Sequence, residues 1–282
     1  EGRLVGSPSR GLGDVYKGQR KLESLAQSGF DPLSRTCRFM LTEEAHHMFV
    51  GETGVGRTIQ ATIDAMNKAG ITDPTDIGKI RDLGVIDLPT IQKKLNLHYS
   101  LSLDLFGQEV STNAANAFNH GIKGRYMEKR IDDDHQLQND TYVVRNVVDG
   151  KIVSQEVPAL TAINMRLRDD YIRDASGGIG RWNKLISKAN IEFQLALPDE
   201  AFHRQIGVFS AIKTDPDGSI ITMEDWERRK GDWLPTLADG DYIQSLMVPC
   251  YEAGKYASWI AAPKVGIDNK PGDFEYVKLH MA

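Results

Sequence analysis

The sequence predicts a mainly α-helical protein with a smaller α+β portion at its C-terminal end. In the first two thirds of the chain, apolar residues recur in long segments at the three- and four-residue spacing of amphipathic helices. Farther along, short stretches alternate between apolar and polar residues and are separated by turn residues, which is typical of strands and hairpins. We therefore divide the chain into an opening segment (1–20), a helical portion (21–189) and a small α+β portion (190–282).

The composition excludes several classes of protein. The 282 residues carry a net charge of −5, with 26% charged and 40% hydrophobic residues. No basic face dominates, so we expect neither nucleic acid nor a membrane surface as the main partner. The two cysteines, Cys37 and Cys250, lie far apart, which indicates a reducing compartment without a disulfide framework. No apolar run approaches the roughly 18 residues of a membrane span, and we expect a cytoplasmic protein.

The opening segment, residues 1–20, has neither helical nor strand periodicity. Its residues 8–17 read like a linker translated in frame, and the chain does not begin with methionine. Segments of this kind are set aside before the fold is considered. We expect residues 1–20 to be non-native and the natural protein to continue upstream of them.

The helical portion opens with a short helix at 21–28, closed by Gly29. A long helix follows, with Pro32 in its first turn, where a missing N–H costs little. We expect three glycines to interrupt this helix before it resumes at 58–68. These glycines, which would let another helix or a bulky ligand approach closely, are Gly51, Gly54 and Gly56.

The rest of the helical portion is predicted from apolar spacing and breakers. Residues 71–90 read as a loop, and a second long helix is expected from 91 to about 118, with an apolar face at Leu95, Tyr99, Leu103 and Phe106. A third helix is expected at 159–175. Glycines at 177–180 should end it before a fourth helix at 181–188.

Strands and short helices make up the remaining elements. Residues 141–157 alternate around Asp149-Gly150, which is a hairpin signal. Residues 191–198 also alternate, and 212–221 surround a strong turn at 215–218. We expect short helices and then a closing strand in the last segments: helices at 224–230 and 239–247, and a strand at 274–279.

The most informative stretch is an acidic and histidine cluster inside the long helix, residues 41–50. Glu44 and His47 lie three residues apart and can present a carboxylate and an imidazole to one point. Di-iron carboxylate proteins use this E-x-x-H spacing inside four-helix bundles, and both ligand types suit iron. Glu43 and His46 have the same spacing about 100° around the helix, so only one pair can bind a given metal. The other pair would support the ligands or face solvent, and a fully solvated helix face is the non-functional alternative.

Two further acid–histidine pairs have the same spacing. Asp132 and His135 are a candidate second ligand pair, with Asp104 as a candidate single carboxylate. The polar residues that follow His135 favour a solvated turn instead. Glu200 and His203 follow the exit of a predicted strand, so we expect them on the surface rather than at a metal.

A different class of function is suggested by residues 51–58, from Gly51 to Thr58. This segment differs at one position from the phosphate-binding P-loop pattern, with Arg57 in place of the lysine, and Asp104 could then hold magnesium. A P-loop requires a buried strand before it, and the preceding acidic and histidine cluster is unsuited to one. Arginine also lacks the compact point charge of lysine. A P-loop NTPase is therefore the less favoured alternative.

Long strings spread along the chain carry a family likeness. One runs from 42 to 52, across the acidic and histidine cluster. Others follow at 84–92, 98–100, 104–107, 123–126, 180–184, 232–235 and 274–277. From about residue 21 to its end, the chain resembles benzoyl-CoA oxygenase component B, a family of di-iron benzoyl-CoA epoxidases, and residues 42–52 resemble its second iron-binding helix.

The resemblance implies a ferritin-like helical bundle, incomplete in this chain, with two irons per complete protein. It implies a monooxygenase that uses O₂ to form the 2,3-epoxide of benzoyl-CoA in aerobic aromatic degradation. It also implies electrons from a separate NADPH-dependent reductase that carries FAD and an iron–sulfur centre. A non-catalytic ferritin-like helical protein is the alternative from another class.

Carried over to this sequence, the resemblance assigns the ligand roles to Glu44 and His47 rather than to Glu43 and His46. It places the other iron ligands upstream of Glu44 and therefore favours neither Asp132 nor His135. We expect the chain to be the C-terminal portion of a longer protein and not to be active alone. Gly51 and Gly54 are candidates for leaving room for substrate, and two basic residues are candidates for binding the phosphates of coenzyme A: Lys123 and Arg125.

Overall fold

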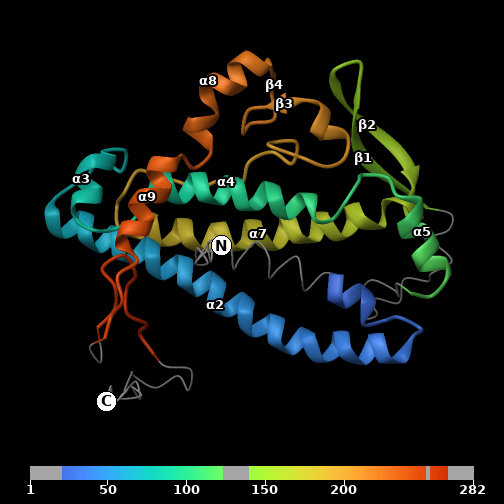
Figure 1. The fold of residues 1–282 in the computed structure, drawn as a ribbon, viewed down its shortest axis with the longest axis horizontal. Coiled ribbons are helices and arrows are strands. Elements are labelled where there is room, and N and C mark those ends of the chain that lie inside the picture. The colour runs from blue at the N-terminus through green and yellow to red at the C-terminus, as the bar shows by residue number, and fades with distance from the viewer. Residues whose placement is uncertain (1–20, 123–139, 252–254, 266–282) are drawn as a thin grey trace. The chain divides into compact units, whose positions relative to one another are not determined.

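Helices dominate the computed structural model, which describes residues 21–122, 140–251 and 255–265 (Figure 1). The helices are α2 (Asp31–Ala69), α3 (Ile77–Asp82), α4 (Leu88–Asp104), α5 (Thr112–Asn119), α7 (Ile163–Lys188), α8 (Met223–Trp233) and α9 (Leu237–Leu246). Residues 21–25 are also helical. The strands form two antiparallel pairs: β1 (Thr141–Val148) with β2 (Lys151–Pro158), and β3 (Lys213–Thr214) with β4 (Ile220–Ile221). The predicted mainly α class is confirmed.

The chain forms two compact units. Among the described residues, the first unit comprises 21–52, 92–122, 140–180 and 196–234, and the second comprises 53–91, 181–195, 235–251 and 255–265. The helices α2, α4 and α7 each contribute residues to both units. No helix in the described part of the chain is both long and apolar enough to cross a lipid bilayer.

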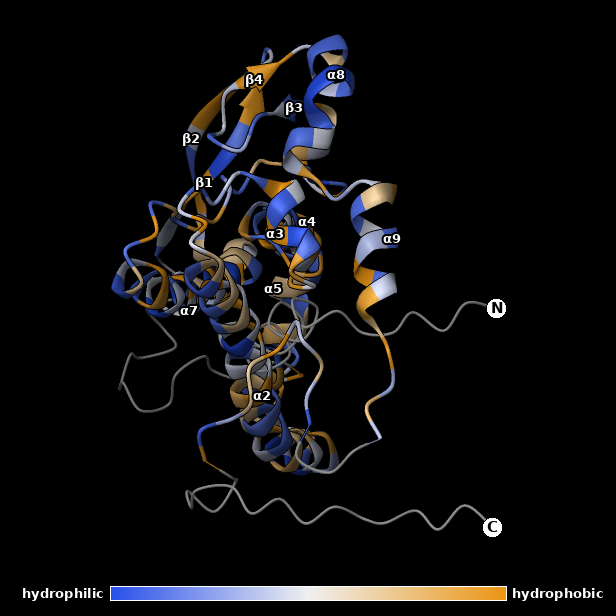
Figure 2. Cartoon of the chain, turned by 90° about the vertical axis from the view of Figure 1, so that its left-hand side faces the viewer, coloured by the Kyte–Doolittle hydropathy of each residue, from blue (hydrophilic) through white to orange (hydrophobic). Residues whose placement is uncertain are grey.

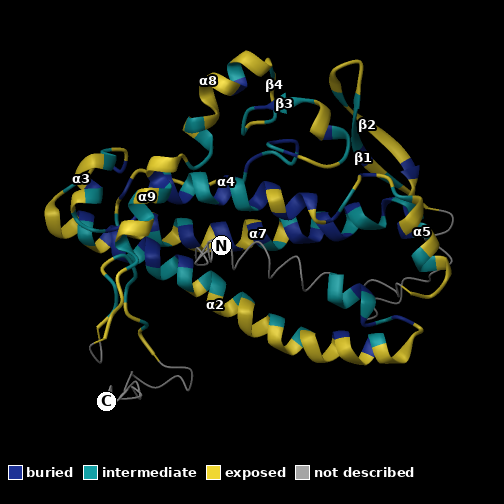
Figure 3. Ribbon diagram, viewed as in Figure 1, coloured by how far each residue is buried: buried dark blue, intermediate teal, exposed yellow. Residues whose placement is uncertain are grey.

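The core of the first unit lies between α4 and α7, whose facing sides are largely buried (Figure 3). The predicted apolar face of α4 is confirmed, since Leu95, Tyr99, Leu103 and Phe106 are all buried. Tyr171 of α7 lies 6.1 Å from Tyr99 and 5.6 Å from Phe106 between ring centroids. Helical periodicity therefore predicted the packed side of α4 correctly.

The hairpins form where the turn residues predicted them. Val148 pairs with Lys151 across Asp149 and Gly150, whose φ angles are 49° and 70°. Two left-handed residues of this type twist a two-residue turn in the sense that antiparallel strands require. Val144 and Val157 pack with Met165 at the start of α7. The hairpin at 212–221 is also confirmed, with only two residues in each strand.

The second unit is held together by buried apolar residues and by a central arginine. Ile59, Ile63 and Met66 of α2 are buried, and Thr62 of the same helix donates to the carbonyl of Ile86 at 2.7 Å. Separately, Arg81 binds the carboxylates of Asp87 at 2.9 Å and Asp239 at 2.5 Å. Asp239 also completes the capping box that starts α9, so one arginine links three segments of this unit.

Two predicted helix breaks do not occur. The helix α2 continues through Gly51, Gly54 and Gly56, and α7 continues through the glycines at 177–180. A glycine costs a helix interior only about 1 kcal/mol, which buried neighbours can offset. Trp182 and Ile186 of α7 are buried in the second unit, and Trp182 fills the space beside Gly56, where a Cβ would meet its ring at 3.6 Å.

The segment from 71 to 118 also differs from its prediction. The predicted loop contains α3, which Asp76 caps by accepting from the backbone N–H of Lys79, and the first turn of α4. The predicted helix from 91 to 118 is two helices. Gly107, with φ of 92°, follows the end of α4, and Ser111 caps the start of α5. Capping side chains, rather than apolar spacing, decide these boundaries.

Residues 191–198 alternate as a strand would, yet they pair with no strand. Side-chain amides take the place of a neighbouring strand here. Asn183 bonds both the N–H and the carbonyl of Leu195 at 2.8 Å, within the second unit. In the first unit, Gln92 bonds the N–H of Ala196 at 2.9 Å and its carbonyl at 2.8 Å. The strand prediction was therefore wrong. The predicted linker at 1–20 and strand at 274–279 lie outside the described residues.

Candidate metal centre

One stripe of the N-terminal half of α2 is turned away from solvent. Its members recur every three or four residues, as one face of a helix requires: Ser34, Cys37, Leu41, Glu44 and Met48. Ser34 anchors this face by donating to the carbonyl of Ala26 at 2.5 Å. The Cys37 thiol is buried, which raises its pKa. Glu44 is thus a carboxylate on the inward side of the helix.

Glu44 and His47 form the closest acid–histidine contact on this helix. The Oε2 atom of Glu44 lies 3.7 Å from Nδ1 of His47, and the two side chains are 20% and 55% exposed, respectively. This Oε2 atom is shielded from solvent and has no hydrogen-bond partner among the described residues. A carboxylate oxygen removed from water is costly unless it is paired, so this atom is poised to receive a cation.

Glu43 and His46 lie on the outer side of α2. Both residues are exposed, as their position about 100° around the helix from Glu44 and His47 requires. The rings of His46 and His47 are tilted, with centroids 6.4 Å apart. The structure therefore places Glu44 inward and Glu43 outward, whereas His46 and His47 are both exposed.

The donor set fits part of an iron site. Glu44 offers an oxygen and His47 a ring nitrogen, which are the ligand types that non-haem iron accepts. Across residues 21–122, 140–251 and 255–265, no cluster of three or more histidine, cysteine, aspartate or glutamate side chains is arranged to hold a metal. The described residues thus offer two neighbouring donor side chains at this place rather than a full coordination shell.

Comparison with known proteins identifies a relative that matches most of this chain. Benzoyl-CoA oxygenase component B from Aromatoleum evansii is 51% identical to this chain over 263 residues, which are 93% of the chain and 55% of that protein. The chain is a homologue of benzoyl-CoA oxygenase component B. It spans about half the length of this relative. No protein-family model matches the chain.

The relationship to component B confirms the resemblance that the strings from 42–52 onward carry. The match covers nearly the whole chain at an identity far above that of unrelated proteins, so the chain and the component B relative share one ancestry. The relative's name identifies it as an oxygenase component.

Asp104 is not a metal ligand in this structure. Its Oδ1 atom binds Nε of the buried Arg204 at 2.6 Å, and its Oδ2 atom accepts from the backbone N–H of Gln205 at 2.9 Å. Because both oxygens are already used, the prediction of Asp104 as a single carboxylate ligand is wrong. The magnesium role also fails, since Asp104 ends a helix and not a strand.

The prediction that Glu200 and His203 lie on the surface is also wrong. Glu200 is largely buried and binds Arg145 at 3.0 Å and Arg168 at 2.9 Å. His203 stacks on Trp226, with ring centroids 5.5 Å apart and planes 15° apart. Both residues lie in turns rather than on a helix, so their spacing does not direct them to one point.

The sequence analysis missed a buried network of charges in the first unit. Arg168, only 2% exposed, lies 3.1 Å from Glu109 and 2.9 Å from Glu200. Arg204 lies 3.6 Å from Glu109. The sequence did contain a sign that Arg168 is buried, because it falls three residues before Tyr171 on the apolar side of the predicted helix. Buried arginines are tolerated when carboxylates pair with them.

The P-loop alternative is contradicted. Residues 51–58 lie inside the continuous helix α2, and no strand precedes them. The Thr58 hydroxyl donates to the carbonyl of Gly54 at 3.1 Å, and Arg57 donates to the carbonyl of Ala261 at 2.6 Å. Helical backbone N–H groups are engaged along the chain and cannot wrap a phosphate as a P-loop does.

The structure describes the two glycines that are candidates for leaving room for substrate, Gly51 and Gly54, but not the other remaining candidates. A Cβ at Gly54 would meet no described atom within 4 Å, and Gly51 is half-buried on the inward stripe of α2. Four candidates lie outside the described residues: Lys123, Arg125, Asp132 and His135.

Proposed function

We propose that Glu44 and His47 are two ligands of a di-iron centre in an oxygenase that forms the 2,3-epoxide of benzoyl-CoA. Two observations support this proposal. The chain is 51% identical to benzoyl-CoA oxygenase component B, and the shielded Oε2 atom of Glu44 lacks a hydrogen-bond partner among the described residues, one helical turn from His47. The second observation carries the assignment of the residues.

The proposed centre divides the chemistry between metal and protein. Iron, when bound, supplies the O₂ chemistry that no amino-acid side chain provides. Glu44 contributes an anionic oxygen from the inward stripe of α2, and His47 contributes a neutral ring nitrogen. The other ligands lie outside the described residues in this proposal, within a ferritin-like bundle of which α2 is one helix. Glu43 and His46 face outward and do not bind the metal.

The proposed substrates and partners follow from the component B relationship. The relative's name describes one component of a multi-component oxygenase. We infer that a separate NADPH-dependent reductase, carrying FAD and an iron–sulfur centre, delivers electrons to the iron. Benzoyl-CoA is the proposed acceptor of oxygen. Gly51 and Gly54 are proposed to leave room for substrate beside α2, and Lys123 and Arg125 are proposed contacts for the coenzyme A phosphates.

Product analysis tests this function. The assay uses the longest natural chain that contains residues 21–282, supplied with benzoyl-CoA, ¹⁸O₂ and a chemical or enzymatic electron donor. We expect one labelled oxygen atom in the thioester product. Glu44→Gln and His47→Asn should lower turnover more than about 100-fold, because loss of groups around a metal costs up to that factor even beyond the ligands.

Matched controls lie one residue away on the same helix. Glu43→Gln and His46→Asn remove the same chemical groups from the outer side of α2, and they should leave turnover within about threefold of the parent protein. Equal losses at both pairs would contradict the ligand assignment. Full turnover in Glu44→Gln would overturn it as well.

A non-catalytic helical protein is the second candidate, because His47 is 55% exposed and the described residues offer only two donors. Under that alternative, the longest natural chain binds no iron and Glu44→Gln changes only stability. If the chain binds iron but forms no oxygenated product, the proposed metal site stands and benzoyl-CoA is rejected as the substrate.

A further inference from the structure

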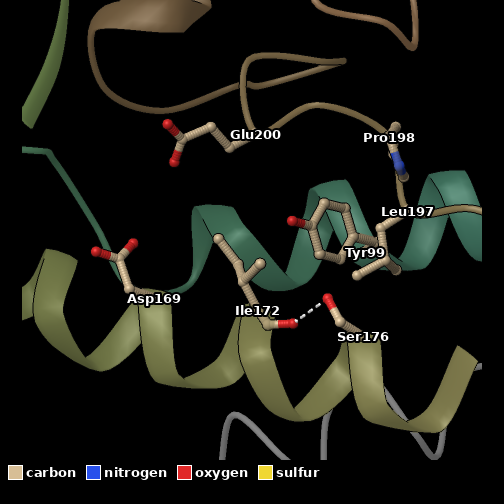
Figure 4. Close-up of a pocket in the computed structure, with 7 residues that line it drawn as sticks. All are labelled: Tyr99, Asp169, Ile172, Ser176, Leu197, Pro198 and Glu200. Carbon is tan, nitrogen blue, oxygen red and sulfur yellow. Dashed lines mark hydrogen bonds between the residues drawn. The ribbon is translucent and has the colours of Figure 1, made fainter. Parts of the chain in front are cut away.

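Two carboxylates at the hollow between α4 and α7 already have partners within the first unit (Figure 4). Glu200 binds Arg145 at 3.0 Å and Arg168 at 2.9 Å, and Asp169 accepts a hydrogen bond from the hydroxyl of Tyr142. A different feature of this unit lies on its surface, where large apolar side chains of α2 are exposed. An exposed apolar patch on a folded protein marks an interaction site.

The N-terminal half of α2 is largely exposed (Figure 3) and apolar on its outer side. Phe39, Met40, Phe49 and Val50 are 74%, 43%, 62% and 52% exposed, and they form what we call the outer face of α2. Phe39 and Val50 are three turns apart and lie within about 20° of each other around the helix. They lie opposite the inward stripe that begins at Ser34. A helix that faced only water here would carry polar residues on this side.

The C-terminal half of the same helix follows the usual pattern. Its exposed residues between 57 and 68 are all polar: Asp64, Asn67 and Lys68. Figure 2 shows α2 with hydrophobic residues beside hydrophilic ones. Because one helix contains both an exposed polar side and an exposed apolar side, the outer face marks a specific place on α2 rather than a property of the whole helix.

We propose that the outer face of α2 is covered by the part of the natural chain that lies outside residues 21–282. The component B relative has the necessary length, since the match spans 55% of that protein and 45% of its length has no counterpart in this chain. A second copy of this chain is disfavoured as the occupant. Glu43 lies near the centre of the outer face, and a two-fold contact between copies would bring two such carboxylates together.

The same cover encloses the proposed metal centre. Met40 and His47 are two turns apart and lie on one side of α2, and His47 is 55% exposed. Metal ligands of a helical bundle project into its interior, so a ligand at this position needs a cover. This consequence rests on the proposed function, whereas the contact itself does not. Glu43→Gln and His46→Asn stay matched controls, because both keep a polar side chain beneath the cover.

Photo-crosslinking in the longest natural chain that contains residues 21–282 tests the contact. The photoreactive amino acid p-benzoylphenylalanine is placed at Phe39, at Phe49 or, as a control, at exposed Asp217. Irradiated protein is digested and analysed by mass spectrometry. We expect positions 39 and 49 to be joined to peptides from outside residues 21–282, and position 217 not to be.

Equal mixtures of ¹⁴N- and ¹⁵N-labelled chains separate contacts within one chain from contacts between copies. Each cross-linked product should carry a single isotope. Products that carry both isotopes would identify a second copy as the occupant and overturn the proposal. Cross-links to residues 21–282 alone, or no cross-link at either position, would overturn it as well.

Truncation of the outer face measures what the contact contributes. Phe39→Ser should lower the folding equilibrium constant of the natural chain by about tenfold or more, because a covered phenylalanine loses its packing. Leu237→Ser truncates a side chain that is 89% exposed, and it should change this constant by less than about threefold. Urea denaturation compares the two variants, and equally small effects would contradict the proposal. Iron content is measured on the same proteins, so a failed contact and a failed metal assignment are recognised separately.

Discussion

At the scale of single residues, the pairing of buried charges decides which candidates can act. Asp104 was a candidate ligand from its residue type, but it is already bound by Arg204 from a distant part of the first unit. Glu44 has no such partner and keeps an oxygen available. The availability of a carboxylate thus depends on tertiary contacts that a local pattern does not contain.

The Asp104–Arg204 pair should contribute strongly to stability. Asp104→Asn leaves the buried guanidinium of Arg204 without its 2.6 Å partner, and removal of one member of a buried pair costs about 3 kcal/mol or more. Urea denaturation of the chain measures this loss. The double variant Asp104→Asn with Arg204→Met should lose less than the sum of the single variants, and strict additivity would show that the pair does not interact.

His203 should make stability depend on pH. Burial lowers its pKa below the ordinary value of 6.5, with Lys213 adding to the effect and Asp104 opposing it. The folded chain therefore binds fewer protons than the unfolded chain below pH 6.5, and the free energy of unfolding falls as the pH drops through this range.

Comparison with a variant isolates this contribution. His203→Asn tolerates the left-handed backbone at this position, where φ is 52°, and it cannot titrate. Denaturant melts at about pH 7.5 and about pH 5 should show a smaller acid-induced loss in the variant. An identical loss in both proteins would contradict a lowered pKa at His203.

At the scale of elements, the sequence predicted hairpins better than helix boundaries. The turn at Asp149-Gly150 requires left-handed backbone, which few residues accept, so its signal is local and strong. Glycines inside α2 and α7 adopt ordinary helical backbone and do not force a break. Packing can outweigh the small free-energy cost of a glycine in a helix. The boundary between α4 and α5 depends on Gly107 and on the Ser111 cap, which apolar spacing does not reveal.

The continuity of α2 makes a prediction about Gly54. A Cβ added there meets no described atom within 4 Å, so Gly54→Ala should stabilise the chain by about 0.5–1 kcal/mol through helix propensity. Gly150→Ala is the opposite case, since its φ is 70° and alanine there is strained. Thermal melts should move in opposite directions for these two variants. A destabilised Gly54→Ala would mean that α2 is not helical at this position.

At the scale of the whole molecule, the family relationship extends over 93% of the chain and was predictable from long specific strings. The division at residue 189 stays a prediction, as does the ferritin-like bundle. Sequence spacing alone left two ligand pairs open on α2. The phase of the helix relative to its packed side distinguishes Glu44 from Glu43, and that phase comes from tertiary packing around Ser34 and Cys37 rather than from the spacing itself.

Iron content tests the central claim that Glu44 and His47 bind metal. The longest natural chain containing residues 21–282 is loaded with ferrous iron without oxygen, desalted and analysed by mass spectrometry of the metal. We predict about two irons per chain, as in di-iron carboxylate proteins, in the parent protein and in the Glu43→Gln and His46→Asn variants. Glu44→Gln and His47→Asn should each lose at least one iron. Full iron content in folded Glu44→Gln would contradict the account.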